Sequence, residues 1–265
     1  MPPFKLADVE RLRQLQPKRR RFDESTDALN GDGSFSLSFR FETVARLFQK
    51  ETGLATRNGI HGPWGLYQDQ KDIDVAQDWK KRRGKLIFLR DNLDFSMALD
   101  FNFLKEGEYT ELGSAEHYAK QQSNERAIEY LAAQTAGALK DLPPYLVADA
   151  LCAVPPCPSK SWDLPTEIVR RIAADCGKDN LSDRIAFKRK KESVKALSLA
   201  EKWKALEAAE CQADPVVKGK TIVLIDDKYQ SGTTAQFVAS KLYDAGAKSV
   251  LGLYCVKTWR DTDNT

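Results

Sequence analysis

The sequence TIVLIDDKYQSGTT, residues 221–234, places two adjacent carboxylates between an apolar run and a small polar segment. The apolar run is typical of a buried strand, so Asp226 and Asp227 are expected where that strand ends. A helix is predicted directly after the polar segment, and a helix N-terminus offers backbone N–H groups and a positive dipole end to an anion. The segment 230–234 is therefore predicted to bind an anionic group. Its predicted ligands are Gln230, Ser231, Gly232, Thr233 and Thr234.

The acidic pair must serve a different part of the same ligand, because two carboxylates would repel a phosphate. Sugar hydroxyls, or a Mg²⁺ ion shared with the ligand, are suitable partners for Asp226 and Asp227. A ribose that carries a phosphate meets both requirements. The patterns GxxxxGK[ST] and GxGxxG do not occur here, so neither a Walker A loop nor a dinucleotide fingerprint is expected.

The elements around this junction predict an α/β fold with a parallel sheet flanked by helices. A strand is expected at 221–225, then a helix within TAQFVASKLYDAG that ends at Gly246, then a strand within SVLGLYCV. Strand, helix, strand in this order forms a βαβ unit with parallel strands. Ligands of such sheets bind at the carboxyl ends of the strands, where the acidic pair is expected.

The junction resembles the phosphoribosyl pyrophosphate signature of type I phosphoribosyltransferases. Ile222–Ile225, the pair Asp226-Asp227 and Ser231–Thr234 match that signature in order and spacing. Upstream, ADALCAVPPCPSKSW and KRKKESVKALSLAEKW extend the resemblance to the ComF-like branch of the family. It covers about residues 107–257.

This resemblance implies a glycosyltransferase of nucleotide metabolism that transfers the phosphoribosyl group of phosphoribosyl pyrophosphate, with Mg²⁺, to a base-like acceptor and releases pyrophosphate. By that analogy Asp226 and Asp227 are catalytic and anchor the ribose hydroxyls. They would help to hold the metal through water, with no direct protein ligand. Lys160 would supply charge to the pyrophosphate loop, and Ser159 and Ser161 would bind there too. The basic segment 184–195 resembles the family's flexible loop.

Departures from the family pattern keep two alternatives open. Lys228, Tyr229 and Gln230 stand where apolar residues and a threonine are usual, and SWDLP replaces an arginine-rich element. One alternative is a non-catalytic phosphoribosyl pyrophosphate sensor or nucleic-acid-associated regulator, with the basic run 18–21 as a contact for nucleic acid. The other is an effector or partner subunit of a bacterial defence complex, which would dock to a protein partner.

Composition sets the remaining bounds. The 265 residues are 42% hydrophobic and 30% charged with a net charge of +3, as expected of a soluble globular chain that cannot be assigned to nucleic-acid binding by charge alone. No signal peptide and no membrane span are expected, so a cytoplasmic location is predicted. Residues 1–105 are predicted to form an α+β accessory or hood region, and residues 106–265 the phosphoribosyltransferase-like core.

Two strands are predicted in the accessory region from strict alternation. Phe35, Leu37, Phe39 and Phe41 recur at period two, and so do the apolar residues from Phe95 to Phe103. Each pattern predicts a strand with one buried face.

Overall fold

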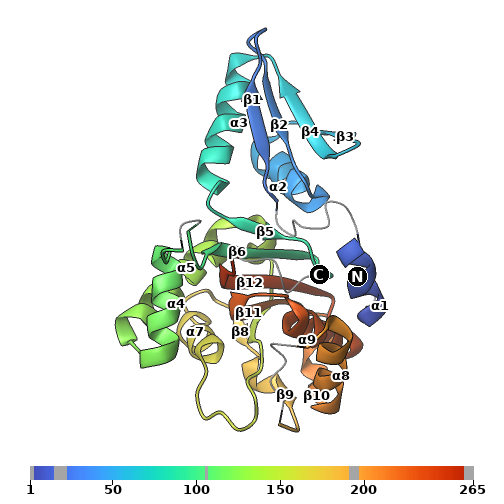
Figure 1. Ribbon diagram of the computed structural model, residues 1–265, viewed down its shortest axis with the longest axis vertical. Helices are drawn as coiled ribbons and strands as arrows, with labels where there is room; N and C mark the ends of the chain where they lie inside the picture. Colours follow the sequence, from blue (N-terminus) through green and yellow to red (C-terminus); the bar gives the residue numbers. More distant parts are fainter. Residues whose placement is uncertain (1–2, 15–22, 105–106, 191–196, 260–265) are drawn as a thin grey trace. The chain divides into compact units, whose positions relative to one another are not determined.

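The computed structural model describes residues 3–14, 23–104, 107–190 and 197–259 (Figure 1). The chain divides into two compact units, one formed by Met1–Arg19 with Asp91–Thr265 and the other by Arg20–Arg90. This division differs from the boundary expected at residue 105. Strand β6 (Phe95–Phe101) belongs to the larger unit because it pairs in parallel with β12 (Ser249–Lys257). Helix α1 (Leu6–Gln14) belongs to the larger unit as well.

The larger unit is built on a parallel sheet in the order β6-β12-β11-β7-β8. The strands not yet given are β11 (Thr221–Tyr229), β7 (Ala150–Ala153) and β8 (Asp179–Asn180). In the middle of this sheet Ile222–Ile225 are completely buried, as their continuous apolar run predicts for a strand covered on both faces. The predicted α/β class, with a mostly parallel sheet flanked by helices, is confirmed.

Helices cover both faces of this sheet (Figure 1). On one face α4 (Glu111–Gln122), α5 (Glu125–Asp141) and α7 (Leu164–Ile172) pack against one another and the strands. On the other face α9 (Thr233–Asp244) packs against the strands and α8 (Leu199–Ala208) against α9. The predicted βαβ unit is confirmed as β11–α9–β12, with β11 and β12 parallel.

Shorter elements complete this unit. They are α6 (Pro143–Leu146), the 3-10 turns η1 (Ser182–Arg184) and η2 (Pro215–Val217), and an antiparallel pair formed by β9 (Ile185–Phe187) and β10 (Cys211–Ala213). The basic segment 184–195 therefore starts at the last residue of η1 and continues through β9. Its residues 191–195 lie outside the described residues.

Two strand predictions need correction. The first concerns β6, where one buried face was predicted, yet every residue from Phe95 to Leu99 is buried. The second concerns β11, which was expected to end at Ile225 but continues to Tyr229, because its parallel ladder with β12 extends to the pair Tyr229↔Lys257. Asp226 and Asp227 consequently lie within a strand, where backbone pairing fixes the direction of each side chain.

The smaller unit carries an antiparallel sheet in the order β1-β2-β4-β3 with two helices. Its elements are β1 (Thr26–Leu29), β2 (Phe35–Ser38), α2 (Glu42–Thr52), β3 (Arg57–Gly59), β4 (Gly62–Tyr67), α3 (Gln70–Arg83) and β5 (Ile87–Leu89). The alternation predicted from Phe35 is confirmed, since Phe35 and Leu37 are buried and Ser38 is exposed. Phe39, Phe48 and Trp79 form an aromatic core, with ring centroids 5.1–5.9 Å apart. Within the described residues, no helix has the length and apolar character needed to cross a membrane.

Candidate functional site

The chain turns tightly between β11 and α9, and position 232 of this turn accommodates only glycine. Three residues, Gln230 to Gly232, separate the last residue of β11 from the first of α9. Gly232 precedes the helix with φ +67°, and a Cβ atom there would lie 2.4 Å from the Tyr229 ring. The chain therefore passes close over that ring, which a larger residue at 232 would prevent. The Ser231 and Thr233 hydroxyls lie 3.0 Å apart within the turn.

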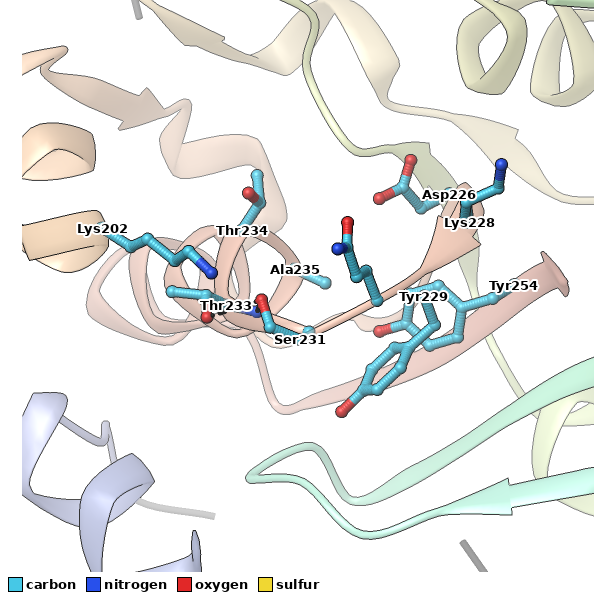
Figure 2. Close-up of a pocket in the computed structure, with 11 residues that line it drawn as sticks. Lys202, Asp226, Lys228, Tyr229, Ser231, Thr233, Thr234, Ala235 and Tyr254 are labelled. Carbon is cyan, nitrogen blue, oxygen red and sulfur yellow. Dashed lines mark hydrogen bonds between the residues drawn. The ribbon is translucent and has the colours of Figure 1, made fainter. Parts of the chain in front are cut away.

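A cavity of about 140 Å³ opens at this turn (Figure 2). Its lining comes from the end of β11, the turn and the first residues of α9, together with Lys202 of α8 and Tyr254 of β12. The lining residues from β11 and α9 are Asp226, Lys228, Tyr229, Gln230, Ser231, Gly232, Thr233, Thr234 and Ala235. The structure thus brings all five predicted ligands of the 230–234 segment to one cavity, together with one of the two predicted carboxylates.

The second carboxylate has a different environment. Asp227 is 6% exposed and does not line the cavity, and its Oδ2 lies 2.5 Å from Lys120 Nζ of helix α4. Glu116, also on α4, lies 3.6 Å from Lys120 and 2.7 Å from Lys228. Burial acts to lower the pKa of Lys120, but the charge and hydrogen bond of Asp227 outweigh it, so that pKa is raised. Asp227 and Glu116 are therefore compensated by lysines of the chain itself.

Helix α1 also reaches the turn. Arg13 Nη2 donates hydrogen bonds to the Ser231 carbonyl oxygen at 3.3 Å and to Thr233 Oγ1 at 3.2 Å. No sequence signal indicated Arg13, Lys120 or Lys202 as residues of this site. Glu116 and Lys120 show the i, i+4 spacing of a helix pair, but their contact with a strand 107 residues further on depends on the sheet topology.

The predicted pyrophosphate loop begins beside the acidic pair. The Val154 N–H, directly after β7, donates to the Ile225 carbonyl oxygen at 2.8 Å. Ser159, Lys160 and Ser161 are exposed and are not part of the cavity lining. The loop ends where Asp163 caps α7 by accepting the Thr166 N–H at 3.1 Å. Ser159, Lys160 and Ser161 thus lie in the loop that follows β7, the strand that pairs with β11.

The donors present at the site bear on the predicted Mg²⁺. Among the described residues, no group of three or more His, Cys, Asp or Glu side chains is placed to hold a metal ion. Asp226 faces the cavity, where its carboxylate is suited to contact a metal ion through a water molecule. The carboxylate of Asp227 is instead paired with Lys120. This arrangement fits a Mg²⁺ ion that is coordinated mainly by oxygen atoms of the bound small molecule and not by protein side chains.

Comparison with families of known proteins finds no matching model, and no curated protein matches. Among solved structures, the chain is similar to orotate phosphoribosyltransferase from Aeropyrum pernix, with 14% identity, a TM-score of 0.34, and coverage of 68% of this chain and 80% of that one. It is also similar to the glutamine phosphoribosylpyrophosphate amidotransferase of B. subtilis, with 16% identity, a TM-score of 0.38 and coverage of 84% of this chain and 46% of that one. A third is the UMP synthase of Leishmania donovani, with 16% identity, a TM-score of 0.33 and coverage of 69% of this chain and 34% of that one. The chain spans less than half of the second and third proteins.

Proposed function

We propose that the chain is a phosphoribosyltransferase that binds phosphoribosyl pyrophosphate and transfers its phosphoribosyl group to a base-like acceptor. The observation that supports this most directly is the cavity at the β11–α9 junction. It combines a helix N-terminus, the hydroxyl groups of Ser231, Thr233 and Thr234, and the carboxylate of Asp226. A ligand that is anionic at one end and carries hydroxyls beside it matches this arrangement.

Each part of the ligand has a proposed place. The 5′-phosphate accepts hydrogen bonds from the backbone N–H groups and hydroxyls of the 230–234 segment. Asp226 accepts hydrogen bonds from the ribose hydroxyls, while Asp227 supports the strand end through Lys120. The pyrophosphate extends toward the loop after β7, where Lys160 supplies a positive charge and Ser159 and Ser161 supply donors. Mg²⁺, held by ligand oxygens and through water by Asp226, would neutralise charge on the leaving pyrophosphate.

In the proposed reaction a nitrogen of the acceptor attacks the anomeric carbon. The bond from that carbon to the pyrophosphate oxygen breaks, and pyrophosphate leaves with the electron pair. The transition state carries positive charge on the ribose ring, which the carboxylate of Asp226 stabilises. No protein nucleophile takes part, so catalysis depends on positioning and on electrostatic stabilisation of the leaving group.

Calorimetric titration of phosphoribosyl pyrophosphate with Mg²⁺ into the wild type and Asp226→Asn tests the binding step. We expect binding by the wild type and at least about 10-fold weaker binding by Asp226→Asn, because a charged hydrogen-bond acceptor for the ribose is removed. Release of pyrophosphate with a panel of purine and pyrimidine bases then tests transfer. Binding without release for any base would favour the sensor alternative, and no binding by the wild type would contradict the proposal.

A further inference from the structure

Lys202 is a buried lysine without a counter-ion in the part of the chain that the structure describes. The residue is 6% exposed, it lines the cavity from helix α8, and no hydrogen bond or ion pair to another described residue involves its ammonium group. Figure 2 shows its Nζ directed toward the turn that carries Ser231 and Thr233. Its ammonium group opens onto the cavity and has no counter-ion among the described residues, so it is available to bind an anionic ligand.

Arg13 provides a second cation on the same turn. Its hydrogen bonds go to two neutral acceptors, the Ser231 carbonyl oxygen and Thr233 Oγ1, and its Nε is buried with no partner among the described residues. Within those residues no carboxylate lies within ion-pair distance of its guanidinium group. Arg13 therefore fixes the turn and adds a positive charge beside it that forms no ion pair with another described residue.

The other lysines around the site differ in this respect. Lys120 is paired with Asp227 at 2.5 Å, and Lys228 with Glu116 at 2.7 Å. Positive charge is compensated at the end of β11 and uncompensated at the start of α9. This asymmetry favours one orientation of a ligand, with its anionic group at the helix N-terminus.

We propose that Lys202 is a direct ligand of a terminal phosphate in this cavity, and that Arg13 is a positioning residue that holds the turn in its binding conformation. Together they make the cavity selective for phosphomonoesters over uncharged sugars. For phosphoribosyl pyrophosphate as the ligand this inference rests on the proposed function, but selection of a phosphomonoester can be tested without it.

The test is calorimetric titration of ribose 5-phosphate and of ribose into the wild type, Lys202→Met and Lys204→Met. Lys204 is an exposed lysine on the same helix and serves as the matched control. Ribose 5-phosphate is expected to bind the wild type and the control alike, and to bind Lys202→Met about 10- to 100-fold more weakly, as loss of a charged hydrogen bond predicts. Ribose is expected to bind none of them.

Fold integrity is checked by thermal unfolding. Lys202→Met is expected to be about as stable as the wild type, because the substitution keeps an unbranched side chain and breaks no ion pair or hydrogen bond to another described residue. A stable variant that has lost affinity supports a ligand role, whereas Kd values of Lys202→Met and wild type within twofold of each other would overturn it.

Arg13 is tested separately with Arg13→Gln, Arg13→Lys and the exposed control Arg11→Gln. Weaker binding of ribose 5-phosphate by Arg13→Gln, with partial rescue by Arg13→Lys, supports the positioning role. Equal affinities for all three would overturn it.

The two proposals fail in distinguishable ways. If ribose 5-phosphate binds through Lys202 but phosphoribosyl pyrophosphate is neither preferred nor consumed, the phosphate site stands and the transferase function does not. If phosphoribosyl pyrophosphate binds and reacts equally well in the wild type and Lys202→Met, the function stands and the role of Lys202 does not.

Discussion

Lys120 Nζ lies 2.5 Å from Asp227 Oδ2, and this ion pair joins helix α4 to the carboxyl end of strand β11 across 107 residues of sequence. The Asp227 side chain is 8% exposed and that of Lys120 is 40% exposed. The contact neutralises Asp227, one of the two carboxylates that the sequence predicted to bind the ligand. It therefore links the helix layer to the strand end on which the proposed site depends.

A double-mutant cycle of Lys120→Met and Asp227→Asn measures this ion pair. We expect a coupling energy of about 1–2 kcal/mol in urea unfolding, less than for a fully buried pair because Lys120 is partly solvated. Lys140→Met, an exposed lysine on the neighbouring helix α5, is the control and should show no coupling with Asp227→Asn. Additive effects of Lys120→Met and Asp227→Asn would show that the contact contributes nothing to stability.

The turn at Gly232 yields a second prediction. Gly232→Ala places a Cβ atom 2.4 Å from the Tyr229 ring at φ +67°, so the turn must shift. We expect at least about a 10-fold loss of affinity for ribose 5-phosphate and a loss of stability of about 1–3 kcal/mol. Gly137→Ala in helix α5, where a Cβ meets nothing within 4 Å, is the matched control and should stabilise the protein by about 0.5–1 kcal/mol. Unchanged affinity in Gly232→Ala would contradict the close approach of turn and ring.

Local sequence signals were sufficient to predict the α/β class and the strand–turn–helix junction around residues 230–234. Four apolar residues, an acidic pair and a Ser-Gly-Thr-Thr turn are all contiguous, and a parallel strand followed by a helix places them together. The end of β11 was not predictable in this way. Asp226, Asp227 and Lys228 have low strand propensity, and only pairing with β12 keeps them in the sheet.

The cations of the site were not predictable for a related reason. Arg13 and Lys202 lie on helices that are separated from the turn in sequence, and each is one of two basic residues on its helix. Which basic side chain reaches the cavity or the turn depends on how α1 and α8 pack onto the core. The alternation from Phe95 led to the wrong prediction that only one face of β6 is buried. A period of two cannot distinguish a strand with one buried face from a strand that is covered on both faces.

Burial of Asp91 predicts a pH dependence of stability. Asp91 Oδ1 accepts hydrogen bonds from the Leu93 N–H at 3.1 Å and from Ser96 Oγ at 2.9 Å, while Oδ2 is buried without a partner among the described residues. Burial raises the pKa of Asp91 to about 7 from its usual 3.8, although these hydrogen bonds act in the opposite direction. Between about pH 4 and 7 the folded state therefore holds a proton that the unfolded state has lost.

The free energy of unfolding is expected to fall as pH rises through this window, by an amount on the order of a few kcal/mol. Asp23, in the other unit, adds a fall of the same sign because burial raises its pKa to about 6. Urea unfolding at pH 4.5, 5.5, 6.5 and 7.5 measures the slope, and Asp91→Asn should reduce it while Asp23→Asn removes a separate part. An unchanged slope in Asp91→Asn would mean that this carboxylate is ionised in the folded protein.

A buried ion pair in the smaller unit gives the last prediction. Arg83 Nη2 lies 2.6 Å from Glu51 Oε1, and Glu51 Oε2 accepts hydrogen bonds from Arg83 Nε at 3.2 Å and from Trp79 Nε1 at 2.6 Å. The Arg83 and Glu51 side chains are 6% and 8% exposed. Glu51→Gln leaves the guanidinium group buried without its counter-ion, so a loss of about 3–5 kcal/mol is expected in urea unfolding.

The exposed pair Glu42–Arg46 on the same helix α2 supplies the control for that measurement, with side chains 63% and 71% exposed. Glu42→Gln should change stability by less than about 1 kcal/mol, because solvent screens the pair. The double variant Glu51→Leu/Arg83→Met should lose less than Glu51→Gln alone, because it leaves no buried charge. If Glu51→Gln were no more destabilising than Glu42→Gln, the Arg83 charge would have to be solvated, and the buried pair would not be a structural element of this unit.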